Sequence, residues 1–207
     1  MTVKENKLSP GQPSQIQWGG GNWVFLDIGF ANRKRSCGLL IGDAPANCVT
    51  FADARQQIMQ WLVNSNSLVN LVIEAPMSVC FDSKGNPKGR SVEISGKGAR
   101  YWYAGLGCGV MVAAMYLIRA ISDDERVIVP VRLFEGFVSY KDSSLPSDHK
   151  DDVLRLIEII RDPVKFSKSI YGADQLKQDE DDVLFSAFRV AGLDCGVPAV
   201  IKPQSEP

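Results

Sequence analysis

The stretch Trp23-Val-Phe-Leu-Asp27-Ile-Gly29 is a short apolar run that ends in an acid and a glycine. Such a run predicts a buried strand with a carboxylate at its end. Two later apolar runs have the same form: residues 68–75 reach Glu74, and residues 127–134 run into Glu135. We therefore expect a sheet of buried strands, several of which end in a carboxylate.

The segments between these strands predict the remaining elements. Residues 37–41 read as the hairpin partner of the first strand, and residues 49–51 as a third short strand. Thr50, with Asp53 three positions later, has the spacing of a helix capping box. The order of elements predicts an α/β fold, in which helices pack on a mixed sheet. Apolar residues recur at helical spacing in four segments, 51–64, 101–120, 148–161 and 179–191.

Length and charge limit the kind of protein. The chain has 207 residues, of which 45% are hydrophobic, with 23 Lys and Arg against 24 Asp and Glu. That size suits one domain, expected over residues 22–195, with a flexible polar leader at 1–21 and a tail at 196–207. A net charge of −1 excludes a globally basic nucleic-acid coat, so any polyanion site would be a local patch.

Cysteine usage and hydropathy bear on the location. The five cysteines form no CxxC pair and are odd in number, which argues against a disulfide framework or a thiolate zinc site and favours a reducing cytoplasm. The apolar segment 104–118 is shorter than the ~20 residues needed to span a bilayer. We therefore expect a buried helix there and no membrane association. The oligomeric state is left open.

The strand-end acids predict a metal site. If the strands of Asp27 and Glu74 are neighbours, their carboxylates meet at one end of the sheet, where such folds form their sites. Like charges at that separation repel each other unless a cation bridges them. Hard oxygen ligands without nearby His or Cys select Mg²⁺ or Mn²⁺. Glu135 is a third candidate ligand, although the neighbouring sequence does not indicate on which face of the sheet its side chain lies.

The acidic run 179–182 offers a further ligand. In a helix over 179–191, Asp181 would share a face with Leu184 and Phe188 and so point toward the sheet, while Asp182 would lie opposite. The alternative is that these acids are solvated charges that favour the helix dipole. The sole histidine, His149, stands at an expected helix start, where it is either a surface residue or an aid to proton transfer.

This order of motifs resembles the RNase H-like superfamily, and within it the predicted RNase H-like nuclease family (domain of unknown function 429). The resemblance covers residues 22–194 and implies a mixed five-stranded sheet flanked by helices, which starts with an antiparallel meander. It also implies that Asp27, Glu74 and an Asp of the final helix hold divalent metal. The chain departs from the family at Ser186-Ala187, where relatives tend to have Asp-Ala, so Asp181 and Asp182 both stay candidates. The matching pieces are Phe25-Leu-Asp27-Ile-Gly-Phe, Val72-Ile-Glu74-Ala-Pro76, Leu133-Phe-Glu135-Gly and 181–187, with Arg90, Arg100 and the helix 150–160.

A basic, glycine-rich loop between the second and third acids predicts a nucleic-acid contact. It carries five cations against Asp82 and Glu93, and it leads into Tyr101-Trp102-Tyr103. Cations that meet phosphates, beside rings that stack on bases, are the components of single-strand recognition. The alternative is a solvated loop whose aromatic residues anchor the next helix. The candidate nucleic-acid-binding residues are Lys84, Lys88, Arg90, Lys97 and Arg100.

Together these features predict a metal-dependent nuclease, in which Asp27, Glu74 and Asp181 are catalytic and Glu135 and Asp182 are additional metal ligands. A phosphotransfer protein of the actin-like ATPase type is the first alternative, because Asp27-Ile-Gly29 resembles the first phosphate loop of such proteins. They need a second domain of similar size, for which 207 residues leave little room. A non-catalytic nucleic-acid-binding module is the second alternative.

Overall fold

A computed structural model describes residues 7–30, 35–95, 98–99, 106–138 and 148–204. Its centre is a mixed sheet in which β2 (Asn22–Ile28) lies between β3 (Cys37–Ile41) and β5 (Val69–Glu74). β3 and β4 (Asn47–Val49) continue antiparallel to one side, whereas β5 and β10 (Val131–Gly136) run parallel to β2 on the other. The prediction of an α/β fold with a mixed sheet is confirmed, but in the described part of the chain this sheet has eight strands and not the five that the resemblance implies.

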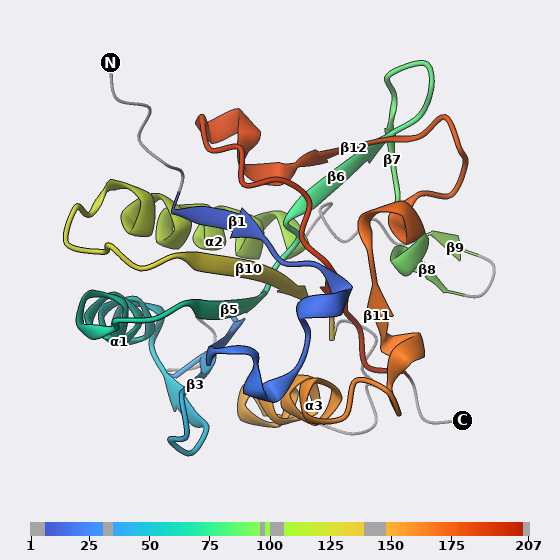
Figure 1. The fold of residues 1–207 in the computed structure, drawn as a ribbon. Coiled ribbons are helices and arrows are strands. Elements are labelled where there is room, and N and C mark those ends of the chain that lie inside the picture. Colours follow the sequence, from blue (N-terminus) through green and yellow to red (C-terminus); the bar gives the residue numbers. More distant parts are fainter. Residues whose placement is uncertain (1–6, 31–34, 96–97, 100–105, 139–147, 205–207) are drawn as a thin grey trace.

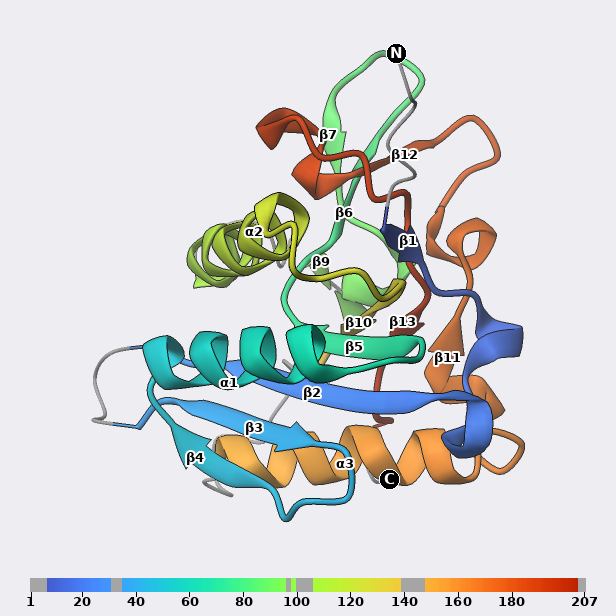
Figure 2. The same cartoon turned by 60° about the vertical axis from the view of Figure 1, so that its left-hand side comes forward.

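Three α-helices cover the sheet, two on one face and one on the other (Figures 1 and 2). α1 (Phe51–Asn64) and α2 (Leu106–Asp123) pack on the face that carries Val24 and Leu26 of β2. α3 (His149–Arg161) packs on the face that carries Trp23 and Phe25. Each central strand is therefore buried on both sides, which explains why its sequence is apolar throughout and does not alternate.

Local sequence signals set the helix ends. Thr50 is the N-cap of α1, and its hydroxyl oxygen accepts a hydrogen bond from the backbone N–H of Asp53 at 3.1 Å, as the capping-box spacing predicts. Asp148 is the N-cap of α3, one residue after the expected start at Ser147, which lies outside the described residues. No helix in the described part of the chain is both long enough and apolar enough to cross a membrane.

Both ends of the chain join the sheet, which differs from the expected leader and tail. β1 (Leu8–Pro10) and β13 (Val200–Ile201) both pair in parallel with β10, and β11 (Ile170–Tyr171) pairs antiparallel with β13. Leu8 and Ile16 are buried in the core, so burial of these apolar side chains holds the N-terminal segment in place. Residues 1–6 and 205–207 lie outside the described residues.

The predicted helix over 179–191 is wrong. Its sequence forms β12 (Val183–Ser186), which pairs antiparallel with β6 (Ser78–Phe81), followed by the short 3₁₀ helix η6 (Ala187–Ala191). The spacing of Leu184, Ala187 and Phe188 fits a helix, but long-range pairing with β6 overrides that local pattern. The remaining short elements are β7 (Pro87–Lys88), β8 (Ile94–Ser95), β9 (Gly98–Ala99), η1 (Pro13–Gln15), η2 (Trp18–Gly20), η3 (Ser91–Glu93), η4 (Ser167–Ser169) and η5 (Ala173–Leu176).

Candidate metal centre

The first two predicted ligands are brought together by strand register. Asp27 on β2 is the direct partner of Glu74 on β5 in the parallel ladder, so both side chains leave the sheet on the same face. Neighbouring strands are about 4.8 Å apart, which sets the scale of the separation between these two residues. Both side chains are buried, and an oxygen of Glu74 accepts a hydrogen bond from the backbone N–H of Val138 at 3.2 Å.

The first turn of α3 adds two residues that the sequence analysis did not select as ligands. His149 and Asp152 are three positions apart and therefore lie on the same side of the helix, facing Asp27. The Nδ1 atom of His149 lies 2.8 Å from Oδ2 of Asp27. One ligand atom from each of Asp27, His149 and Asp152 can be chosen so that all three lie within 4.8 Å of one another. We call these three residues, with the adjacent Glu74, the acidic cluster.

The burial of this cluster has an electrostatic consequence. Asp27 is 1% exposed and Asp152 is fully buried, whereas His149 keeps 24% of its side chain exposed. Two buried carboxylate groups at such close range repel each other when both are ionised. A divalent cation between them would offset that repulsion. The donor set, in which carboxylate oxygens outnumber one imidazole nitrogen, therefore fits a divalent ion on chemical grounds.

Glycines on the strands let α3 approach the sheet closely. A Cβ atom on Gly38, the residue of β3 that pairs with Asp27, would lie 2.2 Å from the backbone oxygen of His149. A Cβ atom on Gly29 would lie 2.3 Å from Nε2 of the same histidine. The absence of side chains at these two positions is what allows His149 to rest over the ends of β2 and β3.

Replacing Gly38 by Ala is expected to displace the first turn of α3, because the new methyl group would meet backbone atoms that cannot rotate away. We expect a loss of about 1–3 kcal/mol in the free energy of unfolding, measured by denaturant titration. The metal-induced rise in melting temperature should fall as well. Gly19→Ala is the control, since a Cβ atom there would meet nothing within 4 Å. Equal stability of the two variants would contradict the close contact.

Glu135 does not join the acidic cluster. It pairs with Ile73, one residue before Glu74, so its side chain leaves β10 on the opposite face of the sheet. There it is fully buried and forms an ion pair with Arg90 at 2.7 Å, and it also accepts a hydrogen bond from the backbone N–H of Met77 at 2.8 Å. The β10 residue on the cluster face is Gly136. The structure thus gives Glu135 a structural partner in place of the predicted metal.

Arg90 is not available to a nucleic acid, because it belongs to this buried ion-pair network. Its guanidinium group is fully buried and donates hydrogen bonds to Glu93, Glu135 and the hydroxyl of Ser78. Burial opposes the charge of Arg90, but Glu135 and Glu93 outweigh that effect and raise its pKa. Burial also raises the pKa of Glu93, against the lowering effect of Arg90.

Lys88 and Asp182, predicted as a phosphate contact and a metal ligand, bind each other. Nζ of Lys88 lies 2.9 Å from a carboxylate oxygen of Asp182, and it also contacts Asp179. The hydrogen bonds to Asp179 and Asp182 raise the pKa of Lys88, and the hydrogen bond from Lys88 lowers the pKa of Asp182. The backbone N–H groups of Gln178 and Asp179 also donate to Asp182, so this side chain closes a turn instead of facing a metal.

The other predicted site residues fall outside the cluster. Asp181 is exposed beside the turn that joins β6 and β7, since the helical phase that aimed it at the sheet does not exist here. Lys84 is exposed in that same turn. Lys97, Arg100 and the aromatic residues 101–103 lie outside the described residues. Of the predicted ligand set, Asp27 and Glu74 are register partners on neighbouring strands, but only Asp27 belongs to the group whose ligand atoms lie within 4.8 Å of one another.

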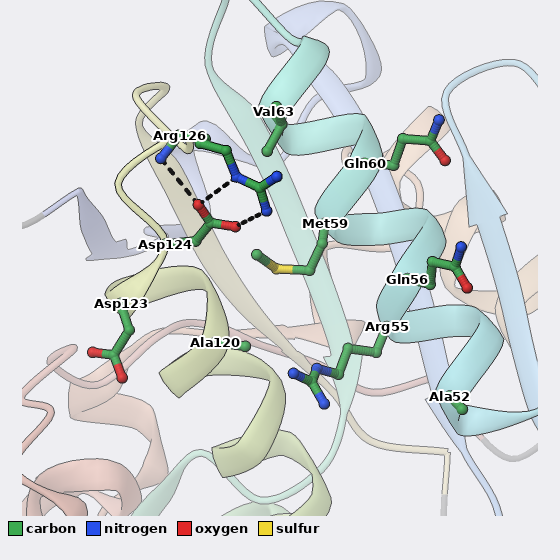
Figure 3. A pocket seen from close by; sticks show the side chains of 10 residues that line it. All are labelled: Ala52, Arg55, Gln56, Met59, Gln60, Val63, Ala120, Asp123, Asp124 and Arg126. Atoms are coloured by element: carbon green, nitrogen blue, oxygen red, sulfur yellow. Dashed lines mark hydrogen bonds and ion pairs between the residues drawn. The ribbon is translucent and has the colours of Figure 1, made fainter.

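A hollow of about 860 Å³ between α1 and α2 does not serve the acidic cluster, because it lies on the opposite face of the sheet. Figure 3 shows its lining, in which the guanidinium group of Arg126 donates two hydrogen bonds to the carboxylate of Asp124.

Searches against protein-family models, curated proteins and solved structures found no match to this chain.

Proposed function

We propose that the chain is a metal-dependent phosphodiesterase that acts on nucleic acid, with Asp27, Glu74 and Asp152 as the acidic ligands and His149 beside them. The observation that carries the proposal is the buried group of Asp27, His149 and Asp152 at the carboxyl end of β2, with Glu74 next to it in register. Carboxylates gathered in this way hold the ions that hydrolyse phosphodiesters in two-metal sites.

The sheet supports the resemblance to the RNase H-like superfamily. The strands β2, β3 and β4 form an antiparallel meander, and β5 and β10 extend the sheet in parallel, which is the kind of five-stranded core that the resemblance implies. The resemblance also implies an Asp from the final helix, which the sequence predicts over 179–191 and which is not formed there. α3 supplies one at Asp152, in place of the acids expected over 179–191.

A bound divalent ion would polarise a phosphoryl oxygen and lower the pKa of a coordinated water. The residues of the chain contribute charge and position. Asp27 and Asp152 present anionic oxygens from two different elements, so the site depends on α3 being docked on the sheet. The contact of Asp27 with Nδ1 holds the ring of His149 beside the carboxylates.

The presence of an imidazole affects which ion we expect. Carboxylate oxygens suit Mg²⁺ and Mn²⁺, whereas imidazole is a better ligand for transition metals. Of the two ions predicted from the sequence, Mn²⁺ accepts the mixed donor set of Asp27, Asp152 and His149 more readily. We therefore propose Mn²⁺ as the preferred activator and Mg²⁺ as the weaker one.

The proposal is tested by incubating the full chain with end-labelled single- and double-stranded DNA and RNA, with Mn²⁺, Mg²⁺ or a chelator. We expect cleavage with Mn²⁺, slower cleavage with Mg²⁺ and none with chelator. A parallel arm measures phosphate release from ATP, which a phosphotransfer protein would show. Absence of cleavage with either ion, together with an unchanged melting temperature on metal addition, would overturn the proposal.

A further inference from the structure

The three-stranded sheet formed by β12, β6 and β7 presents an apolar surface that the core does not cover. Val183 and Phe185 are two positions apart on β12, and Phe81 of β6 is the register partner of Val183, so all three share one face. Val183 and Phe185 are exposed, and the rings of Phe81 and Phe185 pack edge to face with their centroids 6.0 Å apart. Figure 1 shows this sheet far from α3.

A shallow, open hollow of about 570 Å³ lies against this face, with carboxylates at one end. Its apolar lining consists of Phe81, Val183 and Phe185, and its polar end consists of Asp82, Asp181 and the turn that joins β6 to β7. Asp181 is exposed and has no ion-pair partner among the residues that the structure describes. Asp82 accepts hydrogen bonds from Lys84 and Asn86 within its turn, so among the described residues the unpaired negative charge beside the apolar floor is that of Asp181.

A complementary projection follows directly after β12, on η6. Val190 is 87% exposed. The guanidinium group of its neighbour Arg189 lies 5.2 Å from the ring centroid of Phe185, and its contact with Asp194 is long, at 3.8 Å. β12 thus runs from Asp181 and the hollow at its start to Arg189 and the exposed Val190 just after its end.

We propose that this surface binds a second copy of the chain around a two-fold axis. In such an interface each copy places the same patch on the other, so Val190 and Arg189 of one copy meet the hollow and Asp181 of the partner, and the reverse. The carboxylates at the hollow repel phosphates, which argues against a nucleic acid as the occupant. None of these residues belongs to the acidic cluster, so the inference is independent of the proposed function.

The test is sedimentation velocity of the full chain over a wide range of concentration. Only a few exposed apolar side chains line this surface, so we expect it to bury less than the ~800 Å² per partner of a standard interface and to form a weak, reversible dimer. Val190→Glu should raise the dimer dissociation constant by at least about tenfold, because it places a charge in an apolar contact. The matched control is Val164→Glu, since Val164 is 85% exposed but lies after α3, and it should leave the dissociation constant unchanged.

A charge exchange tests the orientation of the two copies. Asp181→Arg and Arg189→Asp should each weaken the dimer by at least about tenfold, and the double variant should recover most of the affinity. Melting temperatures of the three variants show that each remains folded. A chain that sediments as a monomer at every concentration would overturn the proposal, as would a dimer that is equally affected by Val190→Glu and Val164→Glu.

Discussion

Asp27→Asn is expected to abolish metal-dependent cleavage, with a fall in rate of at least about a hundredfold. Metal ions stabilise such transition states by several kcal/mol, and about 1.4 kcal/mol corresponds to a factor of ten in rate. The amide keeps the size of the side chain but removes the negative charge that would hold the ion. Asp152→Asn should have a similar effect, because Asp152 supplies the second buried carboxylate of the cluster.

Thermal unfolding distinguishes variants that no longer bind the metal from variants that no longer fold. In the wild-type chain, added Mn²⁺ should raise the melting temperature, because a ligand that binds the folded state stabilises it. In Asp27→Asn and Asp152→Asn that rise should disappear, while the melting temperature without metal stays close to that of the wild type. The control is Asp43→Asn, in the exposed turn between β3 and β4, which should keep both activity and the metal-induced rise. Full activity in Asp152→Asn would exclude α3 from the site.

The sequence predicts the central strands well because their apolar runs are unmistakable, but it does not predict which way their acids point. In a strand that is buried on one face, alternation would assign each acid to a side. Here both faces are buried, so Asp27 and Glu135 look alike in sequence, although Glu135 faces away from the acidic cluster. Only the register of β10 against β5, offset by one residue from Glu74, distinguishes them.

The proposed ligands from α3 were missed for a different reason. Asp152 stands at the third position after His149, which is a detectable one-face spacing, but Asp27 lies 122 residues before that histidine. No local pattern relates the two. The acidic run 179–182 was a candidate because its charges are adjacent in sequence. Asp182, however, forms an ion pair with Lys88 and accepts a hydrogen bond from the backbone of its own turn. The sequence offers more acidic residues than one metal site needs, and only the tertiary packing determines which of them lie close together.

Arg90→Met is expected to cost about 3–5 kcal/mol of unfolding free energy, the range found when one partner of a buried ion pair is removed. The variant replaces the guanidinium group by a shorter, uncharged, unbranched side chain and leaves Glu93 and Glu135 buried without their cation. Denaturant titration measures the loss. Arg155→Met, at an exposed position of α3, is the control and should change the free energy by no more than about 0.5 kcal/mol.

The pH dependence of this loss follows from the acids that remain. Burial already raises the pKa of Glu93 above its ordinary value of 4.5, and removal of Arg90 removes the main influence that lowers it. A carboxyl whose pKa is higher in the folded than in the unfolded chain binds more protons when folded, so its stability contribution improves as the pH falls. The loss in free energy of unfolding caused by Arg90→Met should therefore become smaller as the pH is lowered from neutral to about 4.5.

The same variant separates the two roles considered for Arg90. If Arg90 holds the strands β6 and β10 together from within, Arg90→Met loses stability, and any change in nucleic-acid affinity follows the fraction of unfolded chain. If it contacts phosphates, the variant stays as stable as Arg155→Met but binds with a weaker salt dependence, because each lost phosphate contact lowers the slope by about one. The first result is expected, since a fully buried guanidinium group that is bound to two carboxylates has no surface to offer a polyanion.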